Sequence, residues 1–88
     1  MPAAAVSAVT VRVLLFAIYA ENLGTETMEV TLPSPATVGE VVGHLRGLSG
    51  GHLLPSKPLC ARNLAHAGPE DPVTDGDEIA ILPPLAGG

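Results

Sequence analysis

The sequence predicts an α+β domain in which one main helix covers one face of a mixed sheet. Three observations lead to this prediction. Two strand-like stretches, 10–17 and 26–32, come early in the chain, one amphipathic stretch follows at 38–48, and a short apolar stretch, 78–82, lies near the end. A chain of 88 residues can build one modest core, and an aromatic content of 2% means that this core is aliphatic.

The first two strands are expected to form a hairpin. Residues 10–17 (TVRVLLFA) are rich in β-branched and aliphatic side chains, which is typical of a buried strand. Residues 20–25 (AENLGT) contain Asn22 and Gly24 and are predicted to form a turn. Apolar and polar side chains alternate in residues 26–32, so we expect a strand with one face buried.

The sequence predicts a single helix, at 38–48. Apolar residues recur at helical spacing and form one stripe: Val38, Val41, Val42, Leu45 and Leu48. Thr37 and Glu40 have the spacing of a capping box, in which each side chain bonds the backbone N–H of the other residue. The preceding strand is expected to stop at Pro33, and Gly50-Gly51 marks the exit from the helix.

The last third of the chain contains shorter elements. A short strand is expected at 59–64, turns at 68–72 and 75–77, and a buried strand at 78–82. The predicted order is therefore strand, strand, helix, strand, strand. If the last strand runs parallel to the first in the centre of the sheet, this is the β-grasp arrangement.

The expected organisation is a β-grasp domain at 10–82 between a flexible leader, 1–9, and an extended tail, 83–88. The leader lacks the positive start of a signal peptide. Arg12 interrupts the apolar run that follows, which favours a strand over a membrane span. The single cysteine, Cys60, fits a reducing compartment. We therefore expect a cytoplasmic protein without a membrane partner.

The charge balance excludes nucleic acid as a partner. The net charge is −5, and the four basic residues are dispersed, whereas phosphate binding requires clustered cations. An acidic domain is better suited to a partner with a basic groove. Asp75, Asp77 and Glu78 are predicted to form a turn and a solvated acidic edge, which is one place where such a groove could dock.

The histidines and the cysteine are not expected to bind a metal. The spacings of His44, His52, His66 and Cys60 match no zinc pattern. His44 follows Glu40 by four residues, as in a solvated pair on a helix. Cys60 has no neighbouring cysteine and is expected to be a small buried hydrophobe. The chain has no nucleophile–base constellation, so we expect neither catalysis by the chain alone nor a stably bound cofactor.

The C-terminal segment has the chemistry of an acyl carrier. Pro83 and Pro84 fix φ and donate no hydrogen bonds, so they lift the chain off the sheet in an extended form. Gly87 and Gly88 can enter a slot that is too narrow for any Cβ. In a partner enzyme, the Gly88 carboxylate can attack the α-phosphate of ATP to give an acyl-adenylate. Sulfide then displaces AMP and leaves a thiocarboxylate, or a persulfide displaces AMP to give an acyl disulfide, from which a thiol releases the thiocarboxylate.

At this point the chain resembles the MoaD/ThiS family of ubiquitin-like sulfur carriers, represented by the small subunit of molybdopterin synthase and the thiamin-pathway carrier. The resemblance extends from residue 11 to residue 88. It rests on 11–17 (VRVLLFA), the turn at 21–24, 36–45 (ATVGEVVGHL), 74–78 (TDGDE) and 81–88 (ILPPLAGG). The Pro-Pro pair before the tail is more similar to the molybdopterin branch than to the thiamin branch.

The resemblance implies a ubiquitin-like β-grasp fold and two enzyme partners. The first is an adenylating enzyme that resembles ubiquitin-activating enzymes and uses ATP. The second, in the molybdopterin branch, is the large catalytic subunit of molybdopterin synthase, which receives sulfur from the tail during molybdenum cofactor biosynthesis. By this resemblance Gly88 is the sulfur donor and Gly87 its steric companion. The partner-binding residues are then Phe16, Leu82, Pro83, Pro84, Leu85 and Ala86. Two positions depart from the family: Ala20 stands where many members have an arginine, and His66 occupies a position that is often apolar.

Two alternatives stay open. The chain could carry sulfur for thiamin, tRNA thiolation or cysteine synthesis, or act as a ubiquitin-like modifier, because all of these share the tail chemistry. In a different class, it could be a β-grasp interaction module whose terminal glycines are incidental. The carrier hypothesis predicts that deletion of Gly88 abolishes function while the fold survives, and the module hypothesis predicts no effect.

Overall fold

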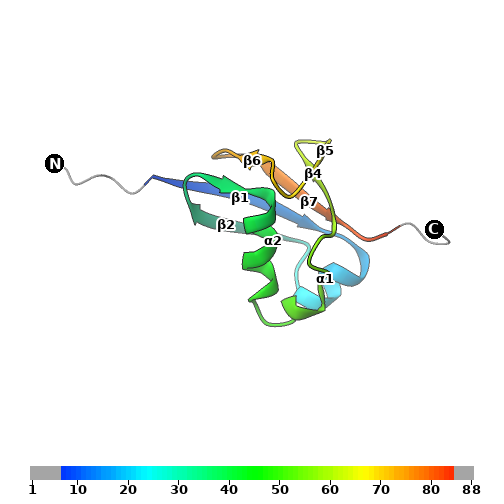
Figure 1. The fold of residues 1–88 in the computed structure, drawn as a ribbon. Coiled ribbons are helices and arrows are strands. Elements are labelled where there is room, and N and C mark those ends of the chain that lie inside the picture. Colours follow the sequence, from blue (N-terminus) through cyan, green and yellow to red (C-terminus); the bar gives the residue numbers. More distant parts are fainter. Residues whose placement is uncertain (1–6, 85–88) are drawn as a thin grey trace.

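Strand β7 (Glu78–Leu82) lies in the centre of a five-stranded sheet in the computed structural model of the protein (Figure 1). It pairs in parallel with β1 (Ala8–Leu15) and antiparallel with β4 (Leu59–Arg62). Beyond them, β2 (Thr27–Pro33) pairs with β1, and β5 (Ala65–Ala67) pairs with β4, so the order is β2-β1-β7-β4-β5. The parallel pair at the centre confirms the predicted β-grasp fold.

Helix α2 (Val38–Arg46) packs across one face of this sheet and begins where the sequence predicts. The Thr37 hydroxyl oxygen accepts a hydrogen bond from the Glu40 N–H at 3.2 Å, and the Glu40 carboxylate accepts one from the Thr37 N–H at 2.9 Å. The predicted capping box is therefore confirmed. The helix ends at Arg46, two residues before the predicted boundary at 48. The structure describes residues 7–84, and the expectations for residues 1–6 and 85–88 lie outside it.

A small second sheet supports the start of α2. It consists of β3 (Ala36–Thr37) and β6 (Pro72–Val73), which pair antiparallel. The loop before β6 also accepts hydrogen bonds from the first turn of the helix, because the Gly39 N–H donates to the Pro69 carbonyl oxygen at 2.8 Å. These contacts satisfy backbone groups that a helix N-terminus leaves without intrahelical partners.

The predicted turn at 20–25 was wrong for most of its length, because a second helix, α1 (Ala17–Leu23), occupies it. Tyr19 on this helix is buried, and Leu23, four residues later, packs against the core. Gly24 closes the helix at a φ of 77°, where its N–H donates to the Ala20 carbonyl oxygen at 2.8 Å. Burial of one face therefore makes this short segment helical.

Three strands also differ in their bounds from the predictions, and β2 differs least, running from Thr27 to Pro33 instead of 26–32. The first strand runs from Ala8 to Leu15 instead of 10–17, so residues 8 and 9 belong to the sheet and not to the expected leader. The strand expected at 59–64 ends at Arg62. Asn63 and Leu64 instead form a turn with φ angles of 51° and 73°, and the chain returns as β5.

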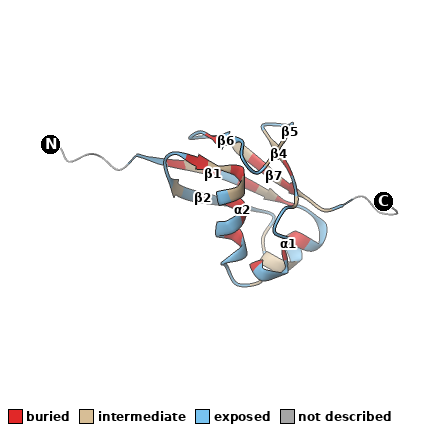
Figure 2. Ribbon diagram, in the orientation of Figure 1, coloured by how far each residue is buried: buried red, intermediate tan, exposed pale blue. Residues whose placement is uncertain are grey.

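The core lies between the sheet and the helices, as the buried residues in Figure 2 show. Its aliphatic character confirms the prediction from composition, with Tyr19 and Cys60 as the remaining members. The buried aliphatic residues are Val9, Val11, Val13, Leu15, Val30, Ala36, Val38, Val41, Val42, Leu45, Leu54, Val73, Ile79 and Ile81. Alternate residues of β1 enter this core, so the intervening residues face the opposite side of the sheet.

The chain after α2 passes so close to both helices that it requires glycine. It enters a short 3₁₀ helix, η1 (Gly51–Leu53), through Gly50, which has a φ of 83°. A Cβ on Gly50 would lie 1.9 Å from the Asn22 carbonyl oxygen, and a Cβ on Gly51 would lie 1.8 Å from the Leu45 carbonyl oxygen. The Gly-Gly pair thus joins α1 and α2 through backbone packing as well as marking the helix exit.

Candidate functional site

The chain leaves the sheet at the end of its central strand. Leu82 is the last residue of β7 and is half-buried, as is Pro83, whereas Pro84 is exposed. Because β1 and β7 are parallel neighbours, β1 begins at one end of the sheet and β7 ends at the other (Figure 1). The segment that leads to the terminal glycines therefore departs from a strand that is held on both sides. The other predicted tail residues, Leu85, Ala86, Gly87 and Gly88, lie outside residues 7–84.

Apolar side chains gather on the outer face of the sheet near this exit. In β7 the core-facing residues are Ile79 and Ile81, so Ala80 and Leu82 face the opposite side. Leu14 lies opposite Ala80 in the register, and Leu59 lies opposite Leu82. We call this surface the exit patch, defined as Leu14, Phe16, Leu59, Ala61, Ala80 and Leu82.

Phe16 occupies the edge of the exit patch nearest the tail. It follows the buried Leu15, has an extended backbone with a φ of −126°, and is 44% exposed. Leu15 is paired with Ile81, so Phe16 lies at the same end of the sheet as Leu82. The two partner-binding residues predicted on the sheet, Phe16 and Leu82, are therefore brought together.

Leu59 belongs to the exit patch but was not among the predicted site residues. It is 45% exposed although it stands in a strand and is apolar. The signal available in the sequence was the alternation in 59–62, which buries Cys60 and so turns Leu59 outward. His66, paired with Ala61 at the margin of the patch, is exposed.

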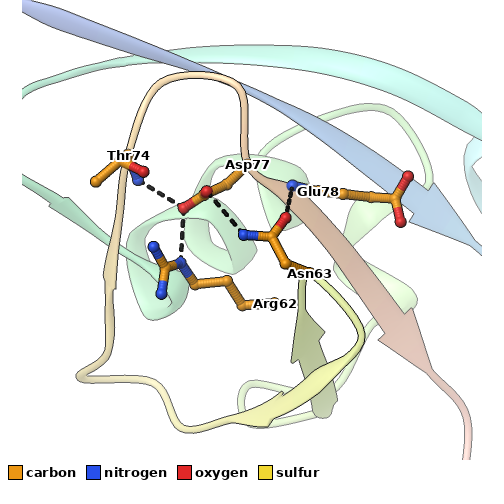
Figure 3. A network of polar contacts seen from close by, with 5 residues as sticks. All are labelled: Arg62, Asn63, Thr74, Asp77 and Glu78. Atoms are coloured by element: carbon orange, nitrogen blue, oxygen red, sulfur yellow. Dashed lines mark hydrogen bonds and ion pairs between the residues drawn. The ribbon is translucent and has the colours of Figure 1, made fainter.

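Asp77 lies at the other end of β7 and is buried, with 6% exposure. Figure 3 shows its carboxylate accepting hydrogen bonds from Arg62 Nε at 2.6 Å, Asn63 Nδ2 at 2.9 Å and the Thr74 N–H at 2.7 Å. The Asn63 amide oxygen in turn accepts from the Glu78 N–H at 2.9 Å. The prediction of a solvated acidic edge was therefore wrong for Asp77, which joins two turns through this network.

The hydrogen bonds also set the charge state of Asp77. Burial alone would raise the pKa of this carboxyl, because it disfavours the charged form. The Thr74 N–H, the Asn63 amide and the Arg62 guanidinium outweigh burial and hold the pKa well below its usual range. Asp77 is thus a carboxylate at neutral pH. It lies away from the tail exit and has a structural role.

Cys60 is a buried thiol, as the sequence predicts. It faces the core with 2% exposure, and burial raises the pKa of the thiol to about 11. Because the thiolate is the reactive form, a pKa this high makes Cys60 a poor nucleophile at neutral pH. The interpretation of Cys60 as a structural residue therefore holds.

Residues 7–84 contain no cluster of three or more His, Cys, Asp or Glu side chains arranged to hold a metal ion. Within the same part of the chain, neither helix has the length and apolar character that a bilayer crossing requires.

The chain is similar to known proteins over most of the domain and over its tail. The ThiS family model matches residues 13–88. The molybdopterin synthase sulfur carrier subunit of Escherichia coli (strain K12) is 37% identical to this chain over an aligned length of 81 residues, and the match covers 89% of this chain and 99% of that relative. The family match therefore includes the exit patch, the terminal glycines and all of the β-grasp domain except the first part of β1.

Solved structures show the same fold. The small archaeal modifier protein 1 of Haloferax volcanii is 30% identical, with a TM-score of 0.76 over 90% of this chain and 99% of that chain. A complex of subunits 1 and 2 of the molybdopterin-converting factor from Helicobacter pylori 26695 contains a chain that is 24% identical, with a TM-score of 0.64 over 90% of this chain and 99% of that chain. Because the identity is only 24%, the similarity to the Helicobacter pylori chain shows a shared fold and nothing more.

Proposed function

The chain belongs to the ThiS family, and on this premise we propose that it is the sulfur-carrying small subunit of a molybdopterin synthase in molybdenum cofactor biosynthesis. In this proposal an oxygen of the Gly88 carboxylate attacks the α-phosphate of ATP and pyrophosphate leaves. Sulfide then attacks the acyl carbon and AMP leaves, which produces a thiocarboxylate. The sulfur is passed to a substrate held by the large subunit.

One structural observation supports this function above the others. The central strand β7 ends at Leu82 inside an apolar patch, and two prolines carry the chain away from the sheet. An apolar surface at the base of an extended segment lets a partner grip the domain while the terminal residues enter its active site. The 37% identity to the Escherichia coli sulfur carrier subunit supports the molybdopterin branch.

The proposal assigns the catalysis to partners. An adenylating enzyme binds ATP and activates Gly88, and the large subunit of the synthase catalyses sulfur transfer. The chain itself then needs no bound cofactor, and its contribution is the tail, with Gly87 beside Gly88 and the exit patch behind it. Because adenylation consumes ATP, we also propose a cytoplasmic location.

The proposal is tested with a chain that carries an N-terminal tag and a free Gly88. Proteins captured from a lysate of the source organism are identified by mass spectrometry, and the recovered adenylating enzyme is incubated with the chain, ATP and sulfide. We expect the intact mass to increase by the difference between sulfur and oxygen, and we expect the Gly88 deletion to show no increase while it unfolds at the same temperature. A thiocarboxylate that forms without Gly88, or the absence of any adenylating partner, would refute the proposal.

A second candidate is a protein modifier, favoured by the 30% identity to the small archaeal modifier protein 1. A modifier would use the same adenylate but transfer the acyl group to a lysine amine. Incubation of the tagged chain with lysate and ATP, without added sulfide, separates the two, because a modifier yields isopeptide-linked conjugates of lysate proteins and a sulfur carrier does not. Capture of thiazole-forming, tRNA-thiolating or cysteine-forming enzymes in place of the large subunit would keep the tail chemistry and change the pathway.

A further inference from the structure

A cleft beside the exit patch is lined by acidic as well as apolar side chains. It opens between the end of β1, helix α1 and the start of β2, and has a volume of about 480 Å³. Leu14, Phe16 and Ala20 provide apolar walls, and Glu21 and Glu26 line it with carboxylate side chains. Because the Ala20 side chain ends at Cβ, this position leaves the cleft open.

None of the Lys and Arg side chains of the described chain lines the cleft. Arg62 is paired with Asp77, and Arg46 donates to the Leu54 carbonyl oxygen. Lys57 lines a different cavity, beneath the N-terminal part of α2. Among residues 7–84 the Arg62–Asp77 contact is the single ion pair, so neither carboxylate of the cleft is neutralised from within this part of the chain.

Arg12 is the remaining cation on the outer face of the sheet, and its neighbours are other carboxylates. In the strand register it lies opposite Glu29 of β2 on one side and Glu78 of β7 on the other. It lines a separate depression together with Glu29 and not the cleft. The two glutamates of the cleft therefore present negative charge to solvent beside an exposed aromatic ring.

The cleft is continuous with the surface that the proposed function assigns to partners. Phe16 belongs both to its lining and to the exit patch, so a protein that covers the patch and holds the tail also covers the cleft. When water is excluded there, the two carboxylates need a cationic partner, because an uncompensated buried charge is strongly unfavourable.

We propose that this cleft receives an arginine side chain of the enzyme that holds the tail, with the guanidinium beside Glu21 and Glu26 and its flat face against Phe16. This inference rests on the proposed function, and it names the chemistry that selects the partner. Arginine fits better than lysine because its planar fork can bond two carboxylates at once and can stack on an aromatic ring.

The first test does not require the partner. The blocked peptides acetyl-Gly-Arg-Gly-amide and acetyl-Gly-citrulline-Gly-amide, which differ mainly in charge, are titrated into the isotopically labelled full chain and followed by NMR. We expect saturable shifts at Phe16, Ala20 and Glu26 with the arginine peptide, at least about tenfold weaker binding of the citrulline peptide, and a similar loss in the Glu21→Gln/Glu26→Gln double variant. Equal binding of both peptides, or shifts outside the cleft only, would overturn the inference.

The second test uses the adenylating enzyme captured above. The Glu21→Gln/Glu26→Gln variant should bind it at least about tenfold more weakly at low salt, and the loss should shrink as ionic strength rises. Ala20→Arg should give a similar loss, because it supplies the cleft with a cation of its own, whereas Glu70→Gln, an exposed change elsewhere, should bind normally. Wild-type affinity in both cleft variants would refute the inference while thiocarboxylation of Gly88 still supported the function. If no adenylating enzyme is captured, the function fails and the peptide titration still decides the cleft.

Discussion

At the scale of single residues, the network of side-chain hydrogen bonds around Asp77 lies at the end of β7 opposite the tail exit. Asp77 is the one charged residue buried among residues 7–84, and its carboxylate joins the β4–β5 turn to the turn before β7. The tail end has no comparable network in the same residues and presents apolar side chains instead. In the proposed function, the stabilising network and the partner-binding surface therefore lie at opposite ends of β7.

Replacement of Asp77 by asparagine should lower the free energy of unfolding by about 2 kcal/mol, because a buried, charged acceptor of three hydrogen bonds is lost. The effect should depend on pH. Since the pKa of Asp77 is lower in the folded chain than in the unfolded chain, its stabilisation is complete above the unfolded pKa of about 4 and is lost as the pH falls further.

Urea unfolding followed by circular dichroism between neutral and acidic pH measures both effects. The wild-type and Asp77→Asn curves should converge as the pH drops below the usual carboxyl range, while Glu70→Gln should follow the wild type throughout. A constant gap between wild type and Asp77→Asn at every pH would contradict the assigned charge state.

Leu64 has a strained backbone conformation in an exposed turn. It is 92% exposed and has a φ of 73°, a conformation that costs an L-residue about 1–2 kcal/mol. Leu64→Gly should therefore raise the free energy of unfolding by up to about 1 kcal/mol, since glycine adopts this conformation without a steric cost. Leu64→Ala, which removes the exposed apolar surface but keeps the Cβ, should change stability by less than about 0.5 kcal/mol. An equal gain in both variants, measured by thermal unfolding, would rule out backbone strain as the cause.

At the scale of elements, sequence and structure agree where local signals are complete and differ where tertiary contacts decide. Helix α2 has its capping box and apolar stripe within one segment, and β7 has the predicted bounds of 78–82. Helix α1 has only seven residues and no side-chain N-cap, and it forms because Tyr19 and Leu23 pack on the core. Its remaining signals in the sequence were the four-residue spacing of these side chains and Gly24.

The small sheet and part of the candidate site could not be predicted for the same reason. Each strand of the β3–β6 pair has two residues, and their partners are distant in sequence. The charge state of Asp77 depends on Arg62 at the end of β4 and on Asn63 in the following turn, so a local interpretation of Thr-Asp-Gly-Asp favours exposure. By contrast, the resemblance alone pointed to Phe16 and Leu82, and the structure places both residues at the tail exit, while their role in partner binding stays a prediction.

The Gly50-Gly51 segment provides a test at this scale. Gly50→Ala and Gly51→Ala should each lower the free energy of unfolding by more than about 2 kcal/mol, because the added Cβ would lie 1.9 Å from the Asn22 oxygen or 1.8 Å from the Leu45 oxygen. Gly43→Ala is the matched control: this position in α2 has open space around a Cβ, and alanine there should stabilise by about 0.5–1 kcal/mol. Chemical denaturation of the three variants checks the order, and a tolerated Gly51→Ala would show that the helix contact can relax.

At the scale of the whole molecule, the two ends of the described chain should differ in whether they tolerate a fused protein. β1 begins at one end of the sheet, while β7 ends at the other, beside the exit patch. A folded protein fused before residue 7 should leave the melting temperature and capture of the adenylating enzyme unchanged. The same protein fused after Gly88 should leave the melting temperature unchanged and abolish thiocarboxylate formation. Intact-mass spectrometry and thermal unfolding of both fusions test this, and sulfur loading of the second fusion would exclude Gly88 as the loaded residue.

The position of β7 between β1 and β4 also determines how the domain responds when its tail is pulled. An edge strand under load can peel away one hydrogen bond at a time. A strand that is hydrogen-bonded on both sides behaves differently when it is pulled along its length. Its hydrogen bonds must break together, so it withstands a larger force. In the proposed function, a tail that is drawn out of one enzyme and into the next would therefore transmit force to a strand that is bonded on both sides, and the domain would move as a rigid body.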